Sequence, residues 1–378
     1  MRFSQIVGQQ AAKEHFLNMW HHQQLPHALL IHGNEGTGVL PFALAISQFI
    51  LCENRQSADA CGQCPACTQA SKLAHPDLNI SFPSIKPEKK KENLSTYYID
   101  EFRKFVAQSP YGTTFDWLQS TGAENKQGNI SAEECRSMIE KLALKSHVEN
   151  GYKILLVWRP EFLGKEGNIL LKLIEEPPAR TILILAAEVL EQILPTILSR
   201  VQRIKLLPLR QEEIAQALSD REQTDVHQAQ RIAMMASGNF HTALQLLHHP
   251  VNDLLPATKH WFNMLFVRRG IDASKAMEEQ AKEGREGIKN FLIYVEHLLQ
   301  AVIRFRYTGQ CRLGGEELDF IQKLAKTPLT QAAIEQMIDA LNRTGFYIQR
   351  NANAKIQLQA LNIEMMYAIQ NKKVSSLN

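Results

Sequence analysis

The chain has 378 residues, of which 44% are apolar, and a formal net charge of +3. This length exceeds one ordinary domain, so we expect about two or three domains with packed cores. The mild charge excludes the strongly basic class of nucleic-acid-binding proteins typified by histones. No run of about eighteen apolar residues predicts a membrane span, and the first residues lack the apolar run of a signal peptide. We therefore expect a soluble, cytoplasmic protein.

Apolar runs separated by helical patterns fill the first half of the chain. Residues 27–32, 153–158 and 181–186 are apolar without alternation. Strands of this kind are typical of a parallel sheet that is covered by helices on both faces. The sequence therefore predicts an α/β nucleotide-binding architecture for this part.

A glycine-rich segment follows the first predicted strand. Gly33, Gly36 and Gly38 give the frame G-x-x-x-x-G of a phosphate-binding loop, or P-loop. A working P-loop continues with Lys, which neutralises the outer phosphates, and with Ser or Thr, which holds Mg²⁺. Val39 and Leu40 stand in these two places. The loop shape is expected to survive without its chemistry, so we expect these residues to form no nucleotide-hydrolysing site.

A cluster of cysteines follows this loop and its helix. Its members, with two short C-x-x-C spacings, are Cys52, Cys61, Cys64 and Cys67. Four thiolates close a tetrahedral zinc shell without an open position, which predicts structural rather than catalytic zinc. An iron–sulfur cluster and a redox role are the alternatives.

Residues 81–129 lack long apolar runs and contain several prolines and glycines. They are predicted to be an insertion with one helix near 99–108. The run Lys89–Lys91, with Lys86 nearby, could lie over DNA phosphates. Glu88 and Glu92 flank it, so a solvated loop is the favoured interpretation.

The strand at 153–158 is followed by Arg159. In nucleotide-hydrolysing folds of this class an acid at the end of such a strand coordinates Mg²⁺, and an arginine there would repel the cation. A second element of hydrolysis is therefore missing. Beyond about residue 208 the sequence predicts short helices near 212–218, 227–236 and 242–247, and then longer amphipathic helices.

These elements occur in an order that resembles the bacterial AAA+ clamp-loader family. The motifs that carry the resemblance over about residues 1–250 are FSQIVGQ (3–9), LPHA (25–28), HPD (75–77), NILLKLIEEPP (168–178) and LSRV (198–201). The degenerate P-loop makes the chain most similar to the delta-prime subunits of the DNA polymerase III clamp loader. Two further losses fit: Ala187 and His241 stand where the family has a polar sensor and a sensor arginine.

The resemblance implies an AAA+ P-loop-type sheet domain over residues 1–208, with a zinc module at about 50–78 and the insertion at about 81–129. A small helical lid over 209–250 and an all-α collar domain over 251–378 follow. It also implies a hetero-pentamer with gamma/tau and delta subunits, which acts on a sliding clamp and primer–template DNA. Val201 replaces the cysteine of the family's Ser-Arg-Cys motif, the insertion is long for the family, and the C-terminal third matches only in helical character.

Within such a ring, Arg200 is expected to reach the ATP of a neighbouring subunit as an arginine finger. A plain surface arginine is the alternative. The paired acids Glu175 and Glu176 end a helix before two prolines, so a structural or interface role is favoured over acid–base catalysis. Two rival functions stay open: an active AAA+ ATPase with an unorthodox P-loop, and a zinc-containing DNA-binding module on a degenerate ATPase fold.

Overall fold

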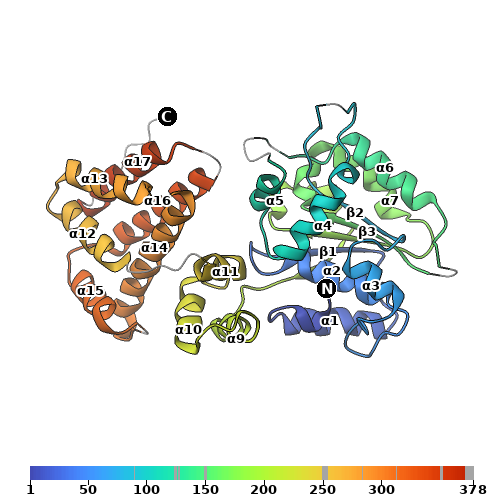
Figure 1. The fold of residues 1–378 in the computed structure, drawn as a ribbon, viewed down its shortest axis with the longest axis horizontal. Helices are drawn as coiled ribbons and strands as arrows, with labels where there is room; N and C mark the ends of the chain where they lie inside the picture. The colour runs from blue at the N-terminus through green and yellow to red at the C-terminus, as the bar shows by residue number, and fades with distance from the viewer. Residues whose placement is uncertain are drawn as a thin grey trace. The chain divides into compact units, whose positions relative to one another are not determined.

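The structure is a computed structural model that describes residues 1–88, 90–122, 126, 128–148, 151–248, 254–282, 284–311, 313–349 and 352–370. Its contacts divide the chain into two compact units, Met1–Leu244 and Gln245–Asn378 (Figure 1). The narrower domain boundaries drawn from the sequence stay predictions. Among the described residues, no helix has both the length and the apolar character needed to cross a membrane.

A parallel sheet forms the centre of unit 1 (Figure 1). Its strands are β1 (Ala28–His32), β2 (Leu78–Ser81), β3 (Lys153–Trp158), β4 (Thr181–Ala187) and β5 (Gln202–Lys205), in the order β2-β3-β4-β1-β5. The register pairs Leu30 with Leu185 and Leu156 with Ile184. The three predicted strands are confirmed as β1, β3 and β4.

Strands β2 and β5 were missed in the sequence. Each has four residues, too few for a periodic signal. Strand β5 is mostly exposed at the edge of the sheet, and only Ile204 among its residues is buried. Three of the four side chains of β5 are exposed, so this strand lacks the apolar run that predicts a buried strand.

Helices cover both faces of the sheet, because successive strand residues point to opposite sides. Leu29 and Ile31 of β1 pack in a core with α1 and α2, whereas Leu30 packs in a second core with α6. The helices of unit 1 are α1 (Gln10–His21), α2 (Val39–Leu51), α3 (Pro65–Ser71), α4 (Ile99–Gln108), α5 (Thr114–Ser120), α6 (Ala132–Ala143), α7 (Leu171–Glu175) and α8 (Pro195–Leu198). The 3₁₀ helices are η1 (Phe3–Gln5), η2 (Ser95–Tyr98), η3 (Pro160–Leu170) and η4 (Leu190–Gln192).

The described helices after the sheet confirm the expected change to helical structure. They are α9 (Gln211–Glu222), α10 (Val226–Met235), α11 (Phe240–His248), α12 (Leu254–Phe266), α13 (Gly270–Ala281), α14 (Gly284–Thr308), α15 (Gly315–Ala325), α16 (Gln331–Gln349) and α17 (Ala354–Ile369). In unit 2, α14 packs against α15 and α16. The stripe Val295, Leu298, Leu299 and Val302 of α14 is fully buried, as a bundle core requires. The α/β sheet domain and the helical C-terminal part together confirm the predicted fold class.

The insertion at 81–129 is built into unit 1 by aromatic side chains. The predicted helix near 99–108 is confirmed as α4, and α5 was not predicted. Phe102 of α4 stacks on Phe82 with ring centroids 3.9 Å apart, and it meets Trp117 of α5 and Trp158 of β3 at 5.2 and 5.5 Å. An antiparallel bridge between Ser84 and Asn129 closes the base of the insertion. The insertion is therefore part of the sheet domain's core.

Replacing Phe102 by alanine should lower the free energy of unfolding of unit 1 by about 3–5 kcal/mol, because it leaves a cavity among the rings of Phe82, Trp117 and Trp158. The measurement is urea unfolding of the full chain followed by circular dichroism. The matched control is Leu144→Ala, since Leu144 is 67% exposed and should change stability by less than about 0.5 kcal/mol. Equal effects of the two changes would contradict the role given to the aromatic cluster.

Candidate functional site

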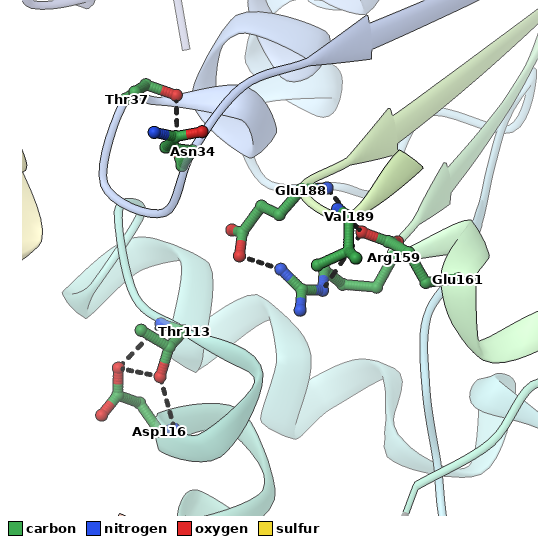
Figure 2. Close-up of polar contacts among 8 residues, drawn as sticks. All are labelled: Asn34, Thr37, Thr113, Asp116, Arg159, Glu161, Glu188 and Val189. Carbon is green, nitrogen blue, oxygen red and sulfur yellow. Dashed lines mark hydrogen bonds and ion pairs between the residues drawn. The ribbon is translucent and has the colours of Figure 1, made fainter. Parts of the chain in front are cut away.

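The loop of residues 33–38 connects β1 to α2. Gly36 and Gly38 have φ angles of +74° and +93°, in the left-handed region that favours glycine. The Thr37 hydroxyl donates a hydrogen bond of 2.7 Å to the Asn34 carbonyl, which holds the turn from inside (Figure 2). Helix α2 begins directly after Gly38.

The two positions that decide phosphate and magnesium binding lie in the protein core. Val39 and Leu40 are each 3% exposed and belong to the apolar cluster beneath the sheet. Every residue of α2 from Val39 to Ile50 is buried. The first turn of the helix therefore offers backbone N–H groups but neither a side-chain charge nor a hydroxyl at these two positions.

An ion pair occupies the carboxyl ends of β3 and β4. Arg159, directly after β3, pairs with Glu188, directly after β4, and their side chains are 12% and 13% exposed (Figure 2). Arg159 thus lies at the expected strand end, and Glu188 neutralises it. The positive charge of Arg159 disfavours a second cation at this point.

A second acid completes this arrangement. Glu161 Oε1 accepts the N–H groups of Glu188 and Val189 at 2.5 and 2.7 Å (Figure 2). Burial raises the pKa of Glu161, and the nearby Arg159 opposes the rise. Sequence reasoning missed both Glu161 and Glu188. Their positions next to a strand end were the available signal, but which acid meets Arg159 depends on the sheet register.

The expected sensor positions have different environments. Ala187 ends β4 fully buried, and its carbonyl accepts the N–H of Gly33 at 3.3 Å. His241 lies in the first turn of α11, with Nε2 at 3.3 Å from Asp116 Oδ2 in the insertion. The structure therefore brings the insertion to the place where the family resemblance led us to expect a sensor arginine.

Arg200 lies after the short helix α8, with 38% of its side chain exposed. It forms an ion pair with Glu175, the last residue of α7, whose side chain is 47% exposed. Its guanidinium also donates to the Thr196 carbonyl at 2.9 Å and to the Ser199 hydroxyl at 3.1 Å. Arg200 is thus an accessible cation whose partners all lie close to the protein surface.

The four clustered cysteines come together between α2 and α3. Their sulfur atoms all lie within 4.8 Å of one another. The Sγ atoms of Cys52 and Cys64 are 4.0 Å apart, and those of Cys61 and Cys67 are 3.9 Å apart. Tetrahedral thiolate coordination with bonds of about 2.3 Å places sulfur atoms about 3.8 Å apart. The cluster therefore fits the geometry of a four-coordinate metal ion.

Backbone donors support thiolates in this cluster. The N–H of Cys61 points to Cys52 Sγ at 3.3 Å, and that of Cys64 points to Cys61 Sγ at 3.4 Å. Backbone N–H groups of Gln63 and Cys64 lower the pKa of Cys61 to about 6, whereas burial raises the pKa of Cys52 to about 12. A bound cation would favour the deprotonated form of all four thiols.

The basic run of the insertion shows no comparable arrangement. Lys89 lies outside the described residues. Lys90 and Lys91 are exposed, and the Lys90 ammonium lies 5.0 Å from the ring centre of Tyr97.

The ion pair at the strand ends should show strong energetic coupling. Arg159→Ala and Glu188→Ala should each lower the free energy of unfolding by about 3–5 kcal/mol, because each change removes one charge of a largely buried pair and leaves the other behind. The double variant should cost less than the sum by at least about 1 kcal/mol. Urea unfolding of the four proteins gives the coupling energy; additive effects within about 0.5 kcal/mol would show that the two residues act independently.

Comparison with known proteins supports a common ancestry for the sheet domain. The family described as DNA polymerase III, delta subunit matches residues 8–210. Subunits delta' of Bacillus subtilis and Yersinia pestis are each 27% identical, over 57% and 52% of this chain and 52% and 44% of their own lengths. A subunit gamma from Buchnera aphidicola is 25% identical over 66% of this chain and 59% of its own length. The chain therefore matches about half the length of these relatives.

A solved structure of a gamma subunit-related protein from Thermotoga maritima aligns with 93% of this chain and 98% of its own, at 14% identity and a TM-score of 0.40. The resemblance drawn from the motifs of the sequence is confirmed by the family match, which covers more than half of the chain. The chain belongs to the DNA polymerase III delta subunit family.

Proposed function

We propose that this chain is a non-hydrolysing, delta-prime-type subunit of a cytoplasmic DNA polymerase III clamp loader. In this proposal it assembles with gamma/tau and delta subunits and supports the ATP-dependent loading of a sliding clamp onto primer–template DNA. Its own contribution to ATP turnover is a single positive charge, that of Arg200, given to the nucleotide of a neighbouring subunit.

The proposal that the chain does not hydrolyse ATP rests on the residues at the positions where a working site binds phosphate and magnesium. Val39 and Leu40 lie buried in the core, and the strand-end arginine is paired with Glu188. A triphosphate needs a lysine and a metal ion to offset its charge. A loop that supplies backbone N–H groups without either of them is a poor site for hydrolysis.

The accessibility of Arg200 supports the second part. An arginine finger must leave its resting partner and reach the γ-phosphate of another chain. An exposed ion pair such as that of Arg200 with Glu175 is worth only about 0–1 kcal/mol, so little free energy opposes its exchange for a phosphate. The planar guanidinium suits bidentate contact with phosphate oxygens.

Arg200→Ala should lower ATP turnover at the neighbouring site of a reconstituted loader by about 10³-fold or more, because the charge that stabilises the transition state is lost. Arg200→Lys should fail as well, since an ammonium cannot reproduce the bidentate contact. Both variants should unfold at the wild-type urea concentration. The measurement is DNA- and clamp-stimulated phosphate release by the complete complex.

The matched control is Arg203→Ala, an exposed arginine three residues further along, which contacts the Leu198 carbonyl. It should leave turnover unchanged. Clamp loading and ATP turnover at the wild-type rate with Arg200→Ala would overturn the assignment.

We also propose that the cysteine cluster holds a structural Zn²⁺, with Cys52, Cys61, Cys64 and Cys67 as its ligands. The short distances between their sulfur atoms support coordination by all four thiolates. Cys64 is also the N-cap of α3, since its sulfur accepts the N–H of Cys67 at 3.4 Å. When bound, zinc would supply a cross-link between the end of α2 and α3. The chain's own residues contribute the N–H donors that stabilise the thiolates.

Inductively coupled plasma mass spectrometry should find one zinc ion per molecule of the purified chain. Cys64→Ser should remove most of the metal and lower the melting temperature by several degrees, because the binding free energy is part of the folding free energy. Cys311→Ser is the control, since Cys311 lies in unit 2 outside the cluster, and should retain the zinc. Iron in place of zinc, or full metal content in Cys64→Ser, would contradict this assignment.

A further inference from the structure

The turn between α4 and α5 of the insertion places one aromatic ring against three separate segments of unit 1. Tyr111 is 5% exposed, and its hydroxyl oxygen accepts the N–H of Val7 at 3.0 Å. Its ring lies 4.9 Å from that of Phe240 at an interplanar angle of 67°. A Cβ atom at Gly38 would lie 2.9 Å from the ring. Tyr111 thus joins the N-terminal segment, the P-loop and the start of α11.

A polar contact lies beside this ring. Asp116 is fixed by Thr113, whose N–H and hydroxyl group donate to its Oδ2 atom at 2.7 and 2.8 Å (Figure 2). The same oxygen lies 3.3 Å from Nε2 of His241, the residue after Phe240. Two neighbouring residues of α11 therefore meet two residues of the insertion.

The turn before α11 also lies directly on the P-loop. The N–H of Phe240 donates to the carbonyl of Gly36 at 3.0 Å. A Cβ atom at Gly36 would come within 1.7 Å of the Asn239 side chain. In a phosphate-binding loop the glycines allow a ligand to approach the backbone closely. Here protein side chains, those of Asn239 and Tyr111, make this approach at Gly36 and Gly38.

We propose that residues 109–116 serve as a built-in substitute for nucleotide, which holds the start of α11 against the P-loop. A ligand that bridges two elements stabilises the arrangement in which both contacts are made. A covalently attached segment does the same at a very high effective concentration and does not diffuse away. The closed arrangement of these three segments is then independent of nucleotide. This role concerns unit 1 alone and does not depend on the function of Arg200.

Two backbone amides report the proposed contacts separately. The amide of Val7 donates to the Tyr111 hydroxyl oxygen, and the amide of Phe240 donates to the P-loop. Hydrogen exchange of the full-length chain, measured at these two amides by NMR or by fragmentation mass spectrometry, follows the opening of each contact. No nucleotide is added.

Tyr111→Phe should speed exchange at Val7 and leave Phe240 unchanged, because the ring stays and the acceptor is lost. Tyr111→Ala should speed exchange at both amides by about tenfold or more, since the ring that packs on Phe240 is removed. Tyr111→Leu keeps most of the volume but loses the aromatic contact, so it covers the case in which the alanine variant does not fold. It should also speed exchange at both amides.

The matched control is Tyr97→Ala, a tyrosine of the same insertion that is 38% exposed, which should change neither amide. Asp116→Asn removes the negative partner of His241 and should speed exchange at Phe240 while Val7 stays protected. If Phe240 keeps its wild-type exchange rate in Tyr111→Leu and in Asp116→Asn, the insertion does not hold α11 on the loop, and the inference is wrong.

Discussion

The ion pair between Arg159 and Glu188 joins the carboxyl ends of the neighbouring strands β3 and β4. The P-loop begins at the carboxyl end of β1, on the same side of the sheet. A working nucleotide site of this type needs an uncompensated carboxylate there to hold magnesium. Once an arginine takes that place, its charge has to be neutralised, and Glu188 does so from the next strand. The same contact that joins the strand ends therefore commits the Glu188 carboxylate to Arg159.

The P-loop also lacks charged or metal-binding side chains at the two positions that follow Gly38. Val39 and Leu40 are packed in the core, and α2 is an almost fully buried helix that contributes to the apolar cluster. The insertion adds aromatic side chains to that cluster and brings the ring of Tyr111 against Gly38 of the loop. Arg200, by contrast, is an exposed cation, with 38% of its side chain accessible.

The central strands and the cysteine cluster could be predicted from local sequence patterns. The contacts between residues far apart in the sequence could not. The apolar runs gave the three central strands, and the cysteine spacing gave a metal-ligand cluster that the structure assembles. Arg159 was recognised because it directly follows a strand. Its partner was not, because residue 188 is brought near only by the register of β3 and β4. The contact of Asp116 with His241 is equally remote in sequence.

Calorimetric titration of the isolated full-length protein with Mg·ATP, combined with an assay for released phosphate, shows whether this chain uses its own P-loop. We expect no saturable binding up to about 1 mM nucleotide, the upper end of common Michaelis constants, and no turnover. Stoichiometric binding in the micromolar range together with steady phosphate release would show that the loop is a working nucleotide site.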